Sequence, residues 1–177
     1  MESGLKDLEI KESLISGKGV FATKDILSGE RICYLNGELC SLDEILSRVS
    51  KHKEEPSDPL QVDIDEYLDL EEASRMFNHS CSPNSFVRGR NELVSMQDIK
   101  NGDEVVFDYS TTMNDDEERI KSAGREVWIG KCNCGNKNCR GKIDQFKTLT
   151  KDIQEYYITN KYMPDFMLKA FQEIILR

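Results

Sequence analysis

The sequence has no long hydrophobic run, and nothing at its start resembles an export signal. Its apolar stretches are a few residues each, far short of the about 20 residues that cross a bilayer. The opening MESGLKDLEIK alternates charged and apolar residues, whereas a signal peptide has a continuous apolar segment. We therefore expect an intracellular protein, cytoplasmic or nuclear, without membrane contact.

Positive charge is also scarce, which limits the partners. The chain has 24 Lys and Arg against 33 Asp and Glu, a net charge of -9. Nucleic-acid binding depends mainly on Lys and Arg that neutralise phosphates, so no direct contact with nucleic acid is expected. A basic partner suits an acidic protein better. Residues 54–72 contain nine Asp or Glu and no Lys or Arg. This acidic stretch forms either an ordinary solvated face or a surface that attracts a basic partner.

The length is sufficient for one folded unit that needs no disulfide bonds. A chain of 177 residues, 38% of them hydrophobic, can bury a core of its own. In a reducing compartment, clustered thiols are more often metal ligands than disulfide partners. Three of the six cysteines, Cys132, Cys134 and Cys139, fall in the stretch KCNCGNKNCR, one ligand short of a structural zinc site.

Short strands joined by tight turns are predicted before this stretch. Residues 19–23 and 30–35 have the composition of strands, and residues 60–70 alternate as a pair of strands would. Between them, Ser41 and Glu44 have the spacing of a capping box and predict a short helix.

The C-terminal part is predicted to be helical. Apolar residues recur at helical spacing over 149–157 and again over 166–175. Tyr156 and Tyr157 at this spacing are more typical of a core than of a cofactor site. The two helices either pack on the rest of the chain or form a dimer contact.

Three polar clusters are candidates for chemistry. Residues 16–21, SGKGVF, either bring the backbone close to a ligand or form an ordinary β-turn. The stretch lacks the continuation of a dinucleotide fingerprint and lacks a Walker sequence. Residues 75–84, RMFNHSCSPN, are suited to a polar small molecule and a metal, or form a capped loop with a buried thiol. Residues 102–110, GDEVVFDYS, predict a strand whose aromatic residues alone would indicate packing.

In this order, and ahead of the cysteines, the clusters resemble the SET-domain protein lysine methyltransferases with a post-SET zinc segment. The resemblance spans residues 14–141 and is closest to the short stand-alone members of bacterial type. It implies a mostly β fold with short helices, in which small sheets surround a knot-like substructure. We divide the chain accordingly into a SET domain (1–130), a post-SET zinc segment (131–142) and a helical C-terminal extension (143–177).

The resemblance also implies roles for individual residues. The family's G-x-G approaches S-adenosylmethionine, its R-F-x-N-H-S-C-x-P-N signature occurs as residues 75–84, and its E-L-x-F-D-Y strand occurs as residues 104–109. The implied catalytic residues are Tyr109 and, beside it in the lysine channel, Phe107. The implied cofactor contacts are Gly17, Lys18, Gly19, Arg75, Asn78, His79 and Tyr109. The implied zinc ligands are Cys132, Cys134, Cys139 and, from the N-H-S-C signature, Cys81.

The acceptor amine is the difficulty for such an enzyme. A lysine near its reference pKa of about 10.4 is almost entirely protonated at pH 7. An apolar channel that desolvates the amine favours its neutral form. Tyr109, with a reference pKa near 10, is a poor base at this pH and is expected to orient the amine. Phe107, on the same side of the predicted strand, leaves room for two or three methyl groups.

Two functions therefore compete. The first is an S-adenosylmethionine-dependent protein-lysine N-methyltransferase that acts on a basic protein such as a histone or a ribosomal protein, with zinc as a structural ion. The second is a zinc-stabilised protein-binding module that has the SET fold without catalysis. The presence of Tyr109, Asn78 and His79 argues against the module. Cys33 and Cys40 match no ligand of the family and are interpreted as buried thiols.

Overall fold

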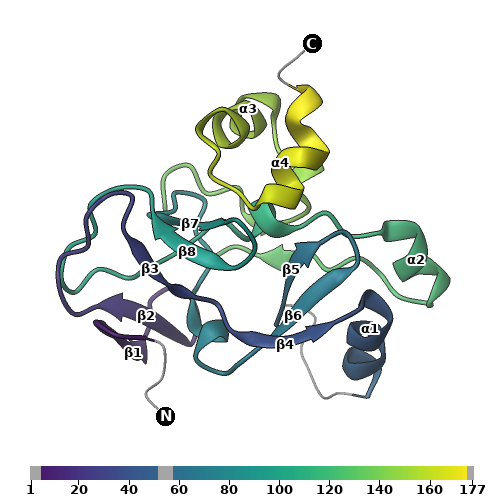
Figure 1. Cartoon of the computed structure of the whole chain (residues 1–177), viewed down its shortest axis with the longest axis horizontal. Coiled ribbons are helices and arrows are strands. Elements are labelled where there is room, and N and C mark those ends of the chain that lie inside the picture. Colours follow the sequence, from purple (N-terminus) through teal and green to yellow (C-terminus); the bar gives the residue numbers. More distant parts are fainter. Residues whose placement is uncertain (1–4, 52–57, 175–177) are drawn as a thin grey trace.

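Small antiparallel sheets make up most of the molecule (Figure 1). The computed structural model describes residues 5–51 and 58–174. Two of the sheets are two-stranded pairs, formed by β1 (Leu8–Glu12) with β2 (Lys18–Ala22) and by β9 (Gly130–Lys131) with β10 (Lys142–Ile143). A three-stranded sheet contains β3 (Arg31–Tyr34), β8 (Glu92–Ser95) and β7 (Ser85–Arg88), and another contains β4 (Gly37–Cys40), β6 (Glu66–Leu70) and β5 (Pro59–Asp63). The predicted mostly β fold is confirmed.

The predicted hairpin and the predicted early strands are present. Residues 60–70 form β5 and β6, which pair with Leu60 opposite Leu68. The stretch 19–23 falls on β2, and 30–35 falls on β3. The turn before β3 depends on Gly29, whose φ of 82° lies in the left-handed region that favours glycine.

The helix α1 (Leu42–Ser50) begins at the predicted capping box. The Ser41 hydroxyl accepts a hydrogen bond from the Glu44 amide, and the Glu44 carboxylate accepts one from the Ser41 amide at 2.8 Å. Leu42 and Ile45 face inward, where they form a small apolar cluster with Tyr67 of β6. This cluster holds α1 beside the β4-β6-β5 sheet (Figure 1).

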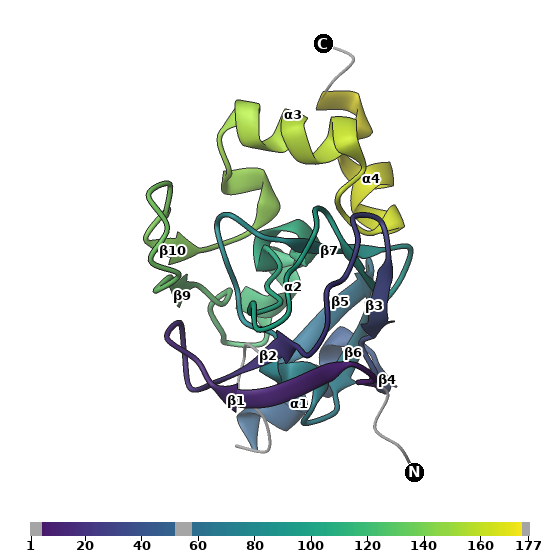
Figure 2. The ribbon, with the colours of Figure 1, turned by 90° about the vertical axis from the view of Figure 1, so that its left-hand side faces the viewer.

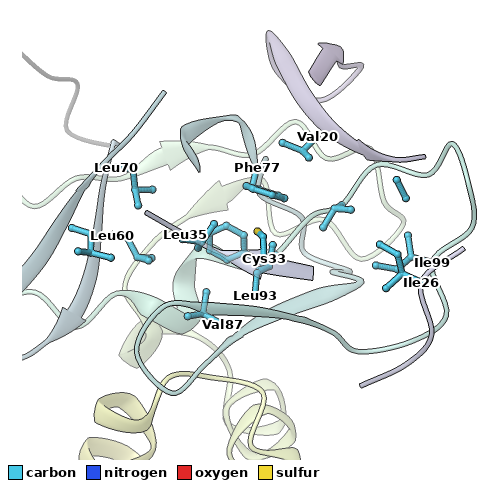
Figure 3. Packing of buried hydrophobic residues seen from close by; sticks show 14 of the residues in the cluster. Val20, Ile26, Cys33, Leu35, Leu60, Leu70, Phe77, Val87, Leu93 and Ile99 are labelled. Carbon is cyan, nitrogen blue, oxygen red and sulfur yellow. The ribbon is translucent and has the colours of Figure 1, made fainter. Parts of the chain in front are cut away.

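The main core lies between the sheets (Figure 3). Phe77 and Leu93 are at its centre and are 1% and 0% exposed. Cys33 belongs to this core, and Cys40 is buried in the cluster beneath α1. Both were interpreted as buried thiols, and their burial is confirmed.

The strand predicted over 102–110 does not form a ladder, so this prediction was wrong. The segment instead passes beside the loop that precedes β7, held by single parallel bridges from Phe107 to His79 and to Ser85. The Asn84 side chain binds the backbone of the segment through one donated and one accepted hydrogen bond, of 2.8 and 2.9 Å. This interleaving of two segments corresponds to the predicted knot-like substructure. At its end the chain turns into the 3-10 helix η2 (Tyr109–Thr112).

Helices follow on both sides of the cysteine stretch. The short α2 (Glu117–Ser122) precedes it, and the turn η1 (Ser74–Met76) lies earlier, before the loop that carries Cys81. After the cysteines come η3 (Phe146–Thr148), α3 (Lys151–Asn160), α4 (Asp165–Phe171) and η4 (Gln172–Ile174). The two predicted C-terminal helices are confirmed as α3 and α4, and residue 175 lies outside the described residues. No helix among the described residues is long and apolar enough to cross a membrane.

The C-terminal helices have a small core of their own and pack on the SET-like sheets. Figure 1 shows α3 and α4 together beyond β7 and β8. The ring of Tyr162 lies 4.9 Å from that of Phe86, and the Asp165 amide donates to the Gly89 carbonyl at 2.9 Å. Of the two helical tyrosines, Tyr157 is buried but Tyr156 is 50% exposed, so the core assignment of Tyr156 was wrong. A dimer contact stays a prediction.

The capping box makes a test of the α1 assignment. Replacing Ser41 by Ala removes the acceptor for an otherwise unpaired amide and should lower the free energy of unfolding by about 1 kcal/mol. Ser47→Ala, in the middle of the same helix, should not lower the free energy of unfolding, because alanine is a better helix former than serine. Chemical denaturation of both variants measures the difference. Equal stability of Ser41→Ala and the wild type would contradict the role of the cap.

Candidate active site

The first two predicted clusters meet at the side chain of Asn78. Its Nδ2 donates to the backbone carbonyl of Ser16 at 3.2 Å and to that of Lys18 at 3.0 Å. The Gly-Lys-Gly turn and the N-H-S-C loop, about 60 residues apart in the sequence, are thereby brought together. The Gly17 backbone has a φ of 46°, and no heavy atom lies within 4 Å of a Cβ built there. This turn therefore leaves space for a ligand close to the backbone.

Glu104 joins the third cluster to the same place. Its Oε1 accepts a hydrogen bond from Asn78 Nδ2 at 2.8 Å and another from the Ser13 hydroxyl at 2.9 Å. A Cβ on Gly19 would lie 2.2 Å from this carboxylate oxygen, so only glycine fits without moving Glu104. The sequence placed Glu104 in the E-L-x-F-D-Y motif, but no hydrogen-bond partner was predicted for its side chain. Nothing in its local sequence indicates this role.

Tyr109 lies at the end of the crossing segment, against Phe107. Their ring centroids are 4.8 Å apart, so the two side chains share one side as predicted, although no regular strand is present. The Tyr109 hydroxyl donates to the carbonyl of Phe77 at 2.6 Å. Burial raises the pKa of Tyr109 above its ordinary value of 10. The phenol therefore stays protonated at neutral pH, and because its proton is donated to the Phe77 carbonyl, its oxygen remains available as an acceptor.

His79 is buried beside this tyrosine, and both nitrogens of its ring contact other groups of the protein. Its Nδ1 accepts the backbone N–H of Tyr109 at 3.2 Å, and its Nε2 lies 3.4 Å from the Cys81 sulfur. Burial lowers the pKa of His79 to about 4, which keeps the ring neutral at pH 7. The imidazole thus fixes the backbone of Tyr109, and a contact of His79 with the cofactor stays a prediction.

An apolar pocket of about 350 Å³ opens beside the rings of Phe107 and Tyr109. Its walls come from α1, from β5 and from the segment 124–128 that leads into the cysteine stretch. Side chains that line it include Leu46, Val49, Phe77, Phe107, Tyr109 and Trp128. The sequence indicated a channel at the two aromatic residues, but it did not indicate that α1 and Trp128 would contribute to it.

A second, more open pocket lies on the other side of the segment 75–77. Lys18 and Met76 line this second pocket, whereas Arg75 and Phe77, the neighbours of Met76, line the apolar one. One short segment therefore separates the Gly-Lys-Gly side of the molecule from the apolar pocket.

Arg75 faces acidic residues of the protein itself. Its guanidinium lies 3.2 Å from an Asp58 oxygen and 2.6 Å from an Asp69 oxygen, and it also donates to the carbonyl of Leu70. These partners hold Arg75 in the wall of the apolar pocket. The predicted contact between Arg75 and a cofactor stays a prediction.

The acidic stretch 54–72 is partly neutralised by arginines of the same chain. In addition to the pairs with Arg75, Glu66 lies 2.6 Å from Arg90, and Asp65 lies 2.7 Å from Arg119. Residues 54–57 lie outside the described residues. The attraction of this stretch for a basic partner is therefore smaller than its formal charge indicates.

The four predicted zinc ligands come together. The sulfur atoms of Cys81, Cys132, Cys134 and Cys139 all lie within 4.8 Å of one another, with 3.6 Å from Cys81 to Cys132 and 3.5 Å from Cys132 to Cys139. Ligands of a tetrahedral zinc ion, with Zn–S bonds near 2.3 Å, are about 3.8 Å apart. The set of four sulfur donors and its spacing therefore fit zinc. Figure 2 shows the β9–β10 pair, which flanks this stretch, projecting from one side of the molecule.

Hydrogen bonds prepare the thiols for a metal. The backbone N–H of Arg140 donates to the Cys81 sulfur, and that of Gly141 donates to the Cys139 sulfur, both at 3.4 Å. Burial alone would raise the pKa of Cys134, but hydrogen bonds from Cys81 and Asn136 lower it to about 6. Zinc binds thiolates, so these hydrogen bonds favour the form of the cysteines that a metal requires.

Four basic residues lie around the cysteines in the sequence, and their side chains have different surroundings in the structure. Arg140 pairs with Asp108, and Lys142 lies 2.7 Å from Asp144. Lys131 and Lys137 are exposed. The sulfurs are therefore contacted by backbone N–H groups more closely than by cationic side chains.

Comparison with known proteins identifies the fold family. Residues 17–110, more than half of the chain, match the sequence profile described as SET domain. The chain belongs to the SET-domain family. The match contains the Gly-Lys-Gly turn, the N-H-S-C loop and Tyr109, and it ends before the three clustered cysteines.

Several curated proteins are similar to this SET domain. The variant-silencing SET domain-containing protein of Plasmodium falciparum (isolate 3D7) is 37% identical over 126 residues, which is 62% of this chain and 5% of that protein. The histone-lysine N-methyltransferase trithorax of Drosophila virilis is 30% identical over 145 residues, 72% of this chain and 3% of that protein. The histone-lysine N-methyltransferase mes-4 of Caenorhabditis elegans is 27% identical over 164 residues, which is 79% of this chain and 17% of that protein. The chain thus spans a small part of each of these relatives.

Solved structures support the same fold. A humanized mutant of the Chaetomium thermophilum Polycomb Repressive Complex 2, bound to the inhibitor GSK126, aligns with a TM-score of 0.53 at 24% identity, over 59% of this chain and 15% of that chain. An apo form of ctPRC2 with two substitutions in Ezh2 aligns with a TM-score of 0.55 at 25% identity, over 60% of this chain and 15% of that chain.

The sulfur cluster gives a direct test of the metal site. Cys81→Ser and Cys134→Ser should each reduce bound zinc from about one ion per chain to nearly none, because a structural site needs all four ligands. Elemental analysis of the purified variants measures this. Cys40→Ala, which removes a buried thiol outside the cluster, should keep its zinc. Full zinc occupancy in Cys81→Ser would exclude Cys81 as a ligand.

Proposed function

We propose that the chain is an S-adenosylmethionine-dependent protein-lysine N-methyltransferase. The observation that carries the proposal is the position of Tyr109. Its ring borders an apolar pocket, and its hydroxyl and backbone are fixed by Phe77 and His79, next to the residue that holds the Gly-Lys-Gly turn. A donor held by the Gly-Lys-Gly turn and an acceptor in the apolar pocket would meet at this phenol.

The donor side would be formed by the Gly17–Gly19 turn and the N-H-S-C loop. The open space at Gly17 and the backbone carbonyls that Asn78 fixes suit a ligand with polar and apolar parts. Lys18 and, through its backbone because its ring is already used, His79 would add further contacts. Arg75 lines the apolar pocket and would reach the donor only where the two sides meet. S-adenosylmethionine supplies a methyl group on a positively charged sulfur.

The acceptor side would be the apolar pocket, with a lysine side chain entering toward Tyr109. An amine transferred from water to such a pocket loses solvation of its charged form, which favours the neutral nucleophile. The Tyr109 oxygen, whose proton is donated to the Phe77 carbonyl, would accept a hydrogen bond from the amine N–H and orient the nitrogen. Because burial raises its pKa, Tyr109 is not the base for the amine proton.

The reaction is an in-line displacement. The lone pair of the neutral amine forms the new N–C bond as the C–S bond breaks, and the proton that the amine loses goes to water. Alignment of the three atoms supplies much of the rate enhancement, and no metal is needed at the reacting carbon. Zinc, held by Cys81, Cys132, Cys134 and Cys139, would have a structural role in fixing the post-SET segment.

A basic protein such as a histone is the proposed substrate. Two of the similar proteins carry the name histone-lysine N-methyltransferase, and the net charge of -9 is complementary to a basic peptide. A substrate of this kind agrees with the proposed intracellular location, nuclear or cytoplasmic. The competing function, a binding module without catalysis, gives no reason for a partly buried tyrosine to be positioned so closely beside the pocket.

Replacing Tyr109 by Phe tests the activity. The variant should methylate a panel of basic proteins at least about a hundredfold more slowly, since the hydroxyl that would orient the amine is lost. Transfer of label from S-adenosylmethionine measures this, and calorimetry should show that the variant still binds the cofactor. Tyr34→Phe, an exposed tyrosine outside both pockets, is the control and should keep full activity. Absence of Tyr109-dependent labelling on every substrate would favour the binding module.

Phe107 tests the number of methyl groups. The wild type should produce di- and trimethyl-lysine, because a phenyl ring leaves more room than a phenol. Phe107→Tyr adds one hydroxyl beside Tyr109 and should shift the product toward monomethyl-lysine. Mass spectrometry of the same peptide after reaction with each enzyme measures the distribution. If the wild type makes only monomethyl-lysine at long reaction times, the assignment of Phe107 fails.

A further inference from the structure

The methyl-transfer scheme leaves out a buried carboxylate next to the proposed catalytic tyrosine. Asp108 is 1% exposed and lies between Phe107 and Tyr109. Its Oδ1 accepts the backbone N–H of Ser110 at 3.1 Å, which also caps the helix η2. A carboxylate buried to this extent is stable only with a charged partner and several hydrogen bonds.

The charged partner comes from the zinc-binding segment. Arg140 donates through Nη2 to Asp108 Oδ1 at 2.7 Å and through Nη1 to Oδ2 at 2.8 Å, a two-point contact. Arg140 directly follows Cys139, and its backbone N–H donates to the sulfur of Cys81. Within the described residues its Nε is buried without a hydrogen-bond partner, so the guanidinium is held from the side of Asp108 and Ser110.

The third partner comes from the C-terminal helices. The hydroxyl of Tyr157, in α3, donates to Asp108 Oδ2 at 2.9 Å, the same oxygen that receives Arg140 Nη1. Tyr157 is 3% exposed, and its ring packs in the C-terminal core against Phe146. This hydrogen bond is thus shielded from water and fixes the orientation of the carboxylate that Arg140 grips.

The C-terminal part also holds the loop that follows Tyr109. The Phe146 amide donates to the Met113 carbonyl at 3.1 Å. The Gln145 side chain accepts from the Asp115 amide at 2.8 Å and donates to the Asp115 carboxylate at 2.7 Å. Residues 113 and 115 both line the apolar pocket. The extension therefore contacts the active-site segment at several points, and Tyr157 is the one that reaches Asp108.

We propose that Tyr157 is a positioning residue for the methyltransferase. Through Asp108 and Arg140 it holds the zinc-binding segment against the segment that carries Tyr109, so the C-terminal helices belong to the catalytic unit. This inference rests on the proposed function for its effect on rate. Its effect on the metal site follows from the contacts alone.

A single-atom change separates this role from general packing. Tyr157→Phe keeps the ring in the C-terminal core and removes only the hydroxyl. Tyr156→Phe is a matched control, because Tyr156 is the preceding residue of α3 and is half exposed. For both variants we would measure the rate at which zinc passes to a chromogenic chelator, kcat and KM for methylation, and the thermal unfolding midpoint.

We expect Tyr157→Phe to release zinc roughly tenfold faster and to lower kcat by a similar factor, the effect of losing one buried hydrogen bond to a charged group. KM for S-adenosylmethionine should change by less than about threefold, and at the assay temperature the protein should remain folded. Tyr156→Phe should match the wild type in every measurement. In an Arg140→Lys background the Tyr157→Phe change should have a smaller effect, since the two residues act on the same carboxylate.

Zinc release at the same rate in the two tyrosine variants would overturn the inference, whatever their activities. So would a normal kcat in Tyr157→Phe when the wild type is active. If the wild type methylates nothing but zinc release still depends on Tyr157, the proposed function fails while the structural link between α3 and the metal site stands.

Discussion

The burial of Asp108 is the constraint on which the arrangement of the site depends. A carboxylate that is removed from water beside the proposed catalytic tyrosine must find its counter-charge inside the protein. The neighbouring residues offer none, and the partner is Arg140, 32 residues later. Electrical neutrality at this one position therefore requires the chain to return from α2 and lay its cysteine stretch against the SET-domain core. The order of segments in space follows from that pairing.

The crossing of residues 104–109 with the loop before β7 imposes a second requirement. A backbone that is buried without a sheet ladder still has to pair its N–H and C=O groups. Backbone groups of neighbouring segments do part of this, since the Val105 N–H donates to the Val20 carbonyl and the Ser80 N–H donates to the Phe107 carbonyl. The Asn84 side chain adds one donated and one accepted hydrogen bond, and the Asn78 side chain donates to the turn at Gly17. Polar residues that look like candidates for ligand binding in the sequence thus hold the backbone as well.

How far the sequence could predict the structure depended on the distance between partners. The capping box at Ser41 has its partner three residues away, and its helix was predicted correctly. The role of Cys81 came from the family resemblance, because its sulfur neighbours are about 50 residues later and no local pattern indicates them. The stretch 102–110 has the composition of a strand, but composition does not specify whether a second strand is available. Helical spacing did not separate Tyr156, on the solvent side of α3, from its buried neighbour Tyr157.

The uneven placement of the four sulfurs has a consequence for how the chain matures. Three thiols lie within eight residues, and they would be near one another even in an unfolded chain. The fourth, at Cys81, becomes a neighbour only after the intervening 50 residues have folded, since closing such a loop carries an entropic cost. With zinc as the proposed ion, its first contact during synthesis would therefore be local and weak. The metal would become firmly bound when the crossing segment is in place, so tight metal retention would mark a chain whose core is already complete.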